Sequence, residues 1–105
     1  FVYTPGADAL IFGEHANGRM IRKGSDQENP LGEWNTIELF TFGRTAVHVV
    51  NGQTVMVNTN TGINENGVIN PLVSGKIQIQ SEGAEFFIKS IKIKPITKLP
   101  ADLLP

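Results

Sequence analysis

The chain has 105 residues, of which 40% are hydrophobic and 18% are charged, and its formal net charge is −1. This composition is that of one globular domain and excludes a disordered chain. The absence of cysteine excludes disulfides and thiolate chemistry, and nine Lys and Arg against ten Asp and Glu leave no basic excess for nucleic acid or an anionic membrane.

The first part of the chain contains short apolar runs separated by glycine and proline. We expect three short strands, at residues 1–4, 9–12 and 19–22. The intervening segment 13–18, GEHANG, has the composition of a loop and ends in Asn17-Gly18, a type I′ turn signal. Residues 23–33 contain Gly, Ser, Asp, Asn and Pro and predict a longer loop.

The middle of the chain predicts three longer strands. In Trp34–Phe42, Ile37 and Leu39 share one face while Phe40 and Phe42 share the other. Because both faces carry apolar residues, we expect a central strand that is covered on both sides for part of its length. Two further strands are expected at 45–50 and 53–58, joined by the hairpin turn Asn51-Gly52, followed by a surface loop over 60–70.

The end of the chain shows the clearest alternation. In Gly75–Lys94 two runs of alternating apolar and polar residues flank the segment 81–84, which predicts an antiparallel hairpin. Residues 95–105 contain three prolines and predict a tail or a segment along a sheet edge. No apolar run approaches the ~20 residues that span a bilayer.

Six to eight short strands without a long helix predict an all-β, antiparallel β-sandwich. We expect residues 1–94 to form its one domain and 95–105 to be a proline-rich tail. Phe40, Phe42, Phe86 and Ile88 lie opposite the main buried sets, as in half of a larger sandwich whose faces accept partner strands from a missing N-terminal half or another chain. The opening at Phe1, without Met, indicates a removed leader or missing upstream residues.

Four segments, in this order and spacing, resemble the DUF1080 family, also called the 3-keto-disaccharide hydrolase domain. They are GEWNT at 32–36, HVVNG at 48–52, GKIQIQSEGAE at 75–85 and IKSIKIK at 88–94. The sequence departs from the family pattern where Ile88, Lys89 and Ser90 replace Phe, Arg and Asn, and lysine cannot form the two-pronged contact of arginine.

The resemblance implies a concanavalin A-like jelly roll, of which this chain is the C-terminal half. It also implies a secreted or periplasmic protein that acts on sugars, including 3-keto-glucosides. The ligand expected from it is therefore a saccharide, and neither a metal nor another cofactor is expected.

Four residues are candidates for catalysis: Glu82, His48, His15 and Glu14. Glu82 lies in the corner after the first strand of the expected hairpin, where a carboxylate at the rim of a sheet can act as acid or base. His48 matches the family histidine and shares a face with Ala46 and Val50. Glu14 and His15 are adjacent in the GEHANG loop, as an acid–base pair would be. Each also has a structural interpretation, as a turn residue, a buried imidazole or loop residues.

Three residues are candidates for substrate binding: Gln80, Arg22 and Arg19. Gln80 lies on the polar face of its strand, and the arginines follow the GEHANG loop, where they can bind a sugar or a carboxylate. Trp34 is either a platform for sugar stacking or a core residue, and the family match favours the core.

Two functions remain open from the sequence. The first is an enzyme that cleaves glycosidic bonds of glucosides or 3-keto-glucosides by hydrolysis or elimination. The second is a lectin-like module that binds carbohydrate without catalysis, because a jelly roll serves either purpose. An exposed aromatic platform without a convergent acid–base pair would favour binding, and Glu82 or His48 in a cleft with a perturbed pKa would favour catalysis.

Overall fold

The computed structural model describes the backbone of residues 2–3, 10–11, 14–15, 20–21, 24–81 and 83–104. The strands are β1 (Val2–Tyr3), β2 (Leu10–Ile11), β3 (Glu14–His15), β4 (Met20–Ile21), β5 (Ile37–Phe42), β6 (Thr45–Val50), β7 (Gln53–Thr59), β8 (Gly62–Glu65) and β9 (Val68–Pro71). One short 3-10 helix, η1, covers Ala101–Leu103. All strand pairs are antiparallel, which confirms the predicted all-β fold.

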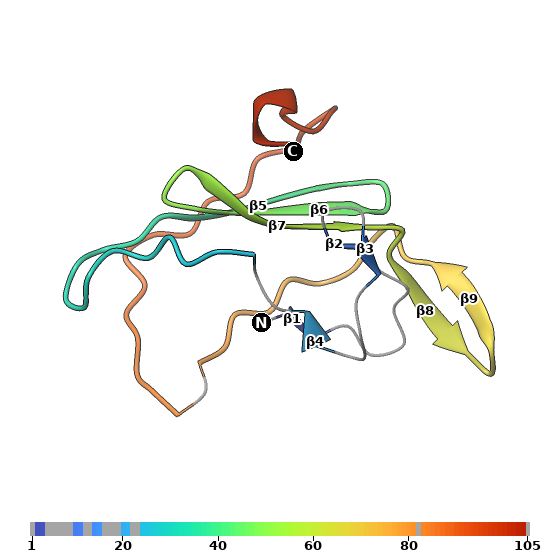
Figure 1. Cartoon of the computed structure of the whole chain (residues 1–105), viewed down its shortest axis with the longest axis horizontal. Coiled ribbons are helices and arrows are strands. Elements are labelled where there is room, and N and C mark those ends of the chain that lie inside the picture. Colours follow the sequence, from blue (N-terminus) through green and yellow to red (C-terminus); the bar gives the residue numbers. More distant parts are fainter. Residues whose placement is uncertain are drawn as a thin grey trace.

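Five strands form the main sheet, in the order β3-β2-β7-β6-β5. The pairs β1-β4 and β8-β9 form separate two-stranded sheets. Figure 1 shows the main sheet edge-on, with the C-terminal segment (residues 96–104) on one side and β1 and β4 on the other. A second sheet packed face to face on this one is not confirmed by the described residues.

The β6–β7 hairpin is the centre of the sheet, and its turn is the one the sequence predicts. Asn51 and Gly52 both have positive φ, 50° and 82°. That is the type I′ geometry, whose twist matches the flanking strands and which Asn-Gly adopts with little strain. A β-bulge between His48 and Val49 then shifts the pairing, so that Val49 faces Thr54 while His48 faces Met56.

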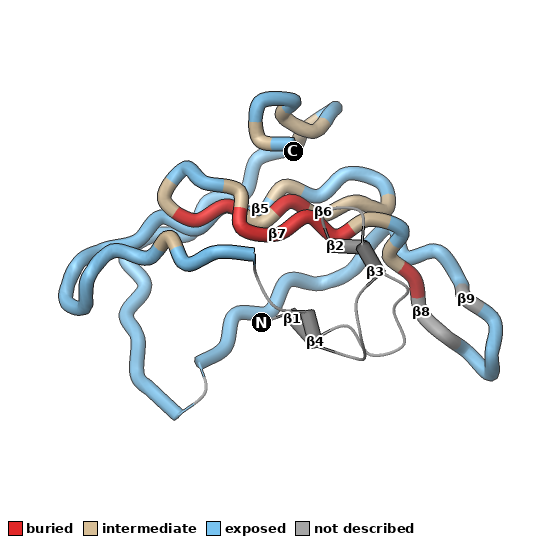
Figure 2. The backbone as a smooth tube through the Cα atoms, in the orientation of Figure 1, coloured by how far each residue is buried: buried red, intermediate tan, exposed pale blue. Residues whose placement is uncertain are grey.

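A cluster of buried valines lies on one face of this hairpin, while Val50 and Met56 are buried on the other face. Val47 and Val49 are fully buried, and Val57, which pairs with Val47, is 5% exposed. Phe40 of β5 packs against them on the same face, together with Leu99 and Leu103 of the C-terminal segment. Figure 2 shows the buried residues as a row along β6 and β7. The proline-rich tail therefore covers the core face of the sheet.

A hydrogen bond also links the C-terminal segment to this face of the sheet. Thr54 Oγ1 donates a hydrogen bond to the carbonyl oxygen of Leu103. Because Thr54 pairs with Val49, it lies on the same face as the buried valines. This bond and the two leucines hold the C-terminal segment against the sheet.

The prediction that Trp34–Phe42 is a central strand is wrong. β5 has a neighbour on one side only, β6, so it is an edge of the described sheet. Ile37 is 75% exposed and Phe42 is 48% exposed. Apolar residues on both faces of a strand do not by themselves show that both faces are covered. In β5 the C-terminal segment covers one face, over Phe40.

Two predicted loops contain strands. β3 lies in the GEHANG segment, where Leu10 pairs with His15 and Ile11 with Glu14. The hairpin β8–β9 lies in the predicted 60–70 loop, around Asn66 and Gly67 with φ of 55° and 86°. This Asn-Gly is the same turn signal as at residues 51–52. The many polar residues beside it led to the prediction of a loop instead of a hairpin.

The hairpin predicted at Gly75–Lys94 does not form. The structure assigns no strand in the described part of this segment, and Ile77, Ile79, Ile91 and Ile93 are 56–84% exposed. Figure 1 shows its two halves running apart from the turn between them. Alternation favours an extended chain, but a two-stranded hairpin is marginal in water unless a third strand or a covering layer supports it.

Candidate functional site

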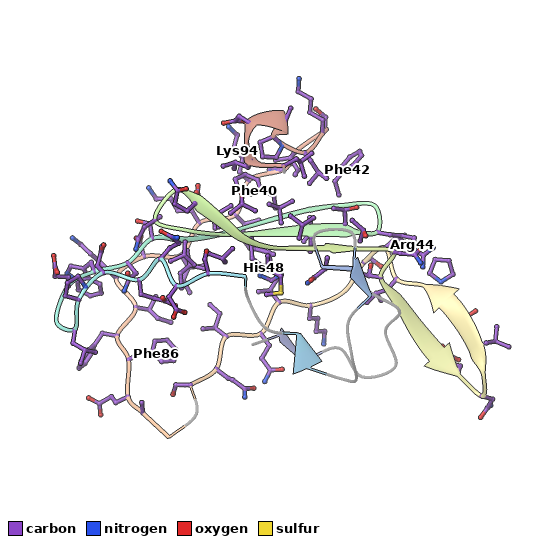
Figure 3. The ribbon with its side chains drawn as sticks, in the orientation of Figure 1. Phe40, Phe42, Arg44, His48, Phe86 and Lys94 are labelled. Atoms are coloured by element: carbon purple, nitrogen blue, oxygen red, sulfur yellow. The ribbon has the colours of Figure 1, made fainter. Side chains whose placement is uncertain are left out.

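His48 lies in the middle of β6, on the face opposite the buried valines Val47 and Val49, and it shares its own face with the buried Met56. Its register partners are Leu39 on β5 and Met56 on β7, so its immediate neighbours across the sheet are apolar. In Figure 3 its side chain points away from Phe40 and Phe42, toward the side of the sheet where β1 and β4 lie. The predicted common face of His48, Ala46 and Val50 agrees with the alternation along β6.

Asn58, at the end of β7, is the polar partner of His48. Its Nδ2 lies 3.3 Å from His48 Nε2. Asn58 pairs with Ala46 and is therefore diagonal to His48, a separation that side chains on one face can bridge. It is only 3% exposed, and within the described part of the chain its Oδ1 accepts no hydrogen bond.

Burial determines the charge of His48. Removing the imidazole from water disfavours its cationic form and lowers the pKa below the ordinary 6.5. His48 is therefore neutral at pH 7, with one nitrogen able to accept a proton and the other able to donate one. A neutral imidazole on a half-buried sheet face is a competent general base or hydrogen-bond donor.

The other predicted catalytic residues differ in how far the structure describes them. Glu82 lies outside the described residues. Glu14 and His15 form β3, of which only the backbone is described. Ile11 pairs with Glu14 on one side and with Asn58 on the other, so Glu14 is two strands from Asn58 in the same row of the sheet. At about 4.8 Å per strand the two backbones are about 10 Å apart.

Among the predicted binding residues, Arg19 and Arg22 lie outside the described residues, whereas Gln80 is described. Gln80 is exposed, and its Oε1 accepts a hydrogen bond of 3.4 Å from Gln78 Nε2. Residues two apart meet in this way in an extended chain, so the two glutamines share a side as the alternation predicts. No hydrogen bond among the described residues joins Gln80 to His48.

Trp34 is exposed, and its interpretation as a core residue is wrong. The residue is 58% exposed, and Lys89 Nζ lies 5.8 Å from the centre of its ring. That distance fits a cation–π contact at the surface. Trp34 precedes β5, where the chain has not yet entered the sheet.

Asn58 is the functional candidate that the sequence analysis missed. Period-two alternation along β7 places it on the same face as Met56. With the regular register of a two-residue hairpin, however, His48 would face Val55, and Asn58 would lie on the opposite face. The bulge at His48/Val49 brings the two polar side chains to one face, and no residue pattern marks it.

No three potential metal-ligating side chains of His, Asp or Glu lie together in the part of the chain that is described. In that same part, no helix has the length and apolar character to cross a bilayer.

Comparison with known proteins identifies one family. The model of the 3-keto-alpha-glucoside-1,2-lyase-like domain matches residues 3–94 and therefore extends further toward the N-terminus than the four motifs. No curated protein and no solved structure matches the chain. The match ends before the C-terminal segment, although Leu99 and Leu103 of that segment pack against the core. The chain belongs to the 3-keto-alpha-glucoside-1,2-lyase-like domain family, as its four motifs predict.

Proposed function

We propose that the protein cleaves the glycosidic bond of 3-keto-glucosides by elimination, with His48 as the base. Membership of the lyase-like family supports the substrate class and the type of reaction. The observation that carries the proposal is the state of His48. Its imidazole is half-buried and neutral, and it lies beside the polar side chain of Asn58, on the face opposite Val47 and Val49.

The reaction needs only one proton-transfer group. A ketone at C3 acidifies the C–H bond at C2, and His48 takes that proton while the electron pair forms the enolate. The enolate then expels the aglycone oxygen from C1, and the C1–C2 double bond forms. The imidazolium returns its proton to the departing oxygen, so atoms and charge balance. General acid–base catalysis of this kind contributes roughly 10²–10⁴ to the rate.

Direct hydrolysis is less well supported by the site. It requires two carboxyl groups, about 5–5.5 Å apart in retaining enzymes and about 6.5–9.5 Å apart in inverting enzymes. The sequence offers Glu82 and Glu14 for that role. Elimination needs a single base, a role that we assign to His48, and we therefore favour it. Secretion or export to the periplasm, and completion of a larger jelly roll by further strands, belong to the same proposal and rest on the family resemblance.

A substrate panel tests the proposal. The protein is incubated with glucosides and the matching 3-keto-glucosides, and the products are followed by mass spectrometry. We expect turnover of the 3-keto compounds only, with a sugar product lighter by one water than the hydrolysis product. His48→Gln retains an amide that can bond to Asn58 but cannot carry a proton, so we expect a loss of at least 10²-fold. Equal rates for His48→Gln and the parent protein would refute the role of His48.

A carbohydrate-binding module is the second candidate, and one observation favours it. Trp34 is 58% exposed, and an exposed indole is a surface on which a sugar ring can stack. If the panel shows binding without turnover, and Trp34→Ala abolishes that binding while His48→Gln retains it, the protein is a binding module. The opposite pattern supports the enzyme.

A further inference from the structure

The Asn58 side chain is buried without full hydrogen bonding. Only 3% of the residue is exposed, and its Oδ1 has no hydrogen-bond partner within the described part of the chain. A buried amide oxygen left unpaired costs about 1–3 kcal/mol. Leucine has the same number and branching of side-chain heavy atoms and would occupy this position beside Met56 without an unpaired polar atom. A buried polar group of this kind calls for a specific explanation.

The contact with His48 provides that explanation. Asn58 Nδ2 and His48 Nε2 are 3.3 Å apart. An amide has nearly the same shape when it is turned by half a turn, so either its NH₂ or its oxygen can face the imidazole. In both orientations the nitrogen it engages is Nε2. His48 Nδ1 is the ring nitrogen that no described residue binds.

We propose that Asn58 is a positioning residue that holds His48 by Nε2, fixes its tautomer and leaves Nδ1 to meet the sugar. This inference rests on the proposed function, because it assigns the reacting atom of the proposed base. It goes further in naming a residue outside the four motifs and in specifying how that residue acts.

The orientation of the amide decides what Nδ1 can do. With Nδ2 toward His48, Nε2 accepts the bond and Nδ1 carries the proton, so the imidazole can donate to a ketone oxygen. With Oδ1 toward His48, Nε2–H donates and Nδ1 becomes the base that takes the C2 proton. The amide oxygen then also stabilises the imidazolium, because a hydrogen bond to the charged form favours it. Proton abstraction therefore uses the second orientation, and Nδ2 becomes free to donate to a sugar hydroxyl.

Nitrogen NMR of the two histidines tests the assignment without any substrate. The chemical shifts of Nδ1 and Nε2 report the tautomer, and His48→Gln identifies which signals belong to His48. In the parent protein we expect one fixed tautomer. In Asn58→Leu we expect the mixture typical of a free imidazole. In Asn58→Asp the carboxylate accepts from Nε2–H, so we expect only that tautomer and a raised pKa of His48. Asn70→Leu, a change at an exposed asparagine, is the control.

Activity provides the second readout. With a 3-keto-glucoside, we expect Asn58→Leu to lower kcat at least tenfold with little change in KM, and Asn58→Asp to restore part of kcat. An unchanged tautomer and titration of His48 in folded Asn58→Leu would overturn the inference. If Asn58→Leu does not fold, Asn58→Asp tests the inference instead. An unchanged pKa of His48 in Asn58→Asp would overturn it. Failure of the proposed function alone would appear as a fixed tautomer in a protein without turnover.

Discussion

Asn51 is expected to be the most stabilising residue in the turn of the central hairpin. Its Oδ1 accepts a hydrogen bond of 2.9 Å from the backbone N–H of Thr36. Its Nδ2 donates to the carbonyl oxygen of Gln27 at 2.8 Å and to Asn35 Oδ1 at 2.9 Å. One side chain thus joins the β6–β7 turn to the loop that precedes β5. The residue also adopts φ of 50°, a left-handed conformation that asparagine tolerates and alanine resists.

The magnitude follows from separating these two contributions. Each hydrogen bond contributes about 0.5–1.5 kcal/mol net, and solvent competes for these partly exposed partners, so we expect Asn51→Gly to cost about 2 kcal/mol. Glycine adopts positive φ freely, so this change removes the bonds without strain. Asn51→Ala removes the same bonds and adds about 1 kcal/mol for the left-handed backbone, giving about 3 kcal/mol. Asn51→Asp keeps the acceptor for Thr36 and should cost about 1 kcal/mol.

Urea unfolding at neutral pH measures all three variants. The midpoint concentration should fall in the order parent, Asp, Gly, Ala, with an unchanged slope of the transition. Gln53→Ala, at an exposed neighbouring position, serves as the control and should stay within about 0.5 kcal/mol of the parent. A free energy of unfolding for Asn51→Gly equal to that of the parent would show that the three hydrogen bonds do not stabilise the fold. Equal values for Gly and Ala would show that the positive φ carries no cost.

Three further predictions concern the core, the C-terminal segment and pH. Val47→Ala removes two buried methyl groups and should lower the free energy of unfolding, measured in urea, by about 2–3 kcal/mol. The exposed Val73→Ala should change it by less than about 0.5 kcal/mol. Equal effects of the two changes would contradict the burial of Val47 in the core. Leu103→Ala should destabilise the protein by about 1–2 kcal/mol and Leu104→Ala by less, because of these two leucines only Leu103 packs on the valines. The reverse order would show that the C-terminal segment does not pack on the valines through Leu103. The pKa of His48 in the folded protein lies below the ordinary 6.5 of the unfolded chain, so between these two pKa values the unfolded state binds more protons. The contribution of His48 to stability is therefore fully present above pH 6.5 and is lost as the pH falls from 6.5 toward the folded pKa. His48→Gln should remove this loss, and an unchanged pH profile in that variant would exclude His48 as its source.

The predictions from sequence succeeded where local chemistry decides the conformation. Asn51-Gly52 specifies a tight turn, and the alternating residues on each side specify the strands that it joins, so β6 has its predicted bounds and β7 extends one residue further. They failed where a strand depends on a neighbour. The alternation at Ile77 and Ile79 is as regular as that of β6, yet no strand pairs with it among the described residues. The same applies to β5, whose two apolar faces could not reveal that only one of them is covered.

The sequence by itself determined the all-β character, the central hairpin and the family, and it gave His48 as one of four catalytic candidates. All of these depend on residue types at fixed spacing, which the chain carries whether or not it is folded. The tertiary structure alone decided which faces are covered and which side chains meet. The bulge between His48 and Val49 adds one residue to one strand, and in a sheet a shift by one residue exchanges the two faces. That shift brings Asn58 to the face of His48, and with it the pair on which the proposed chemistry depends.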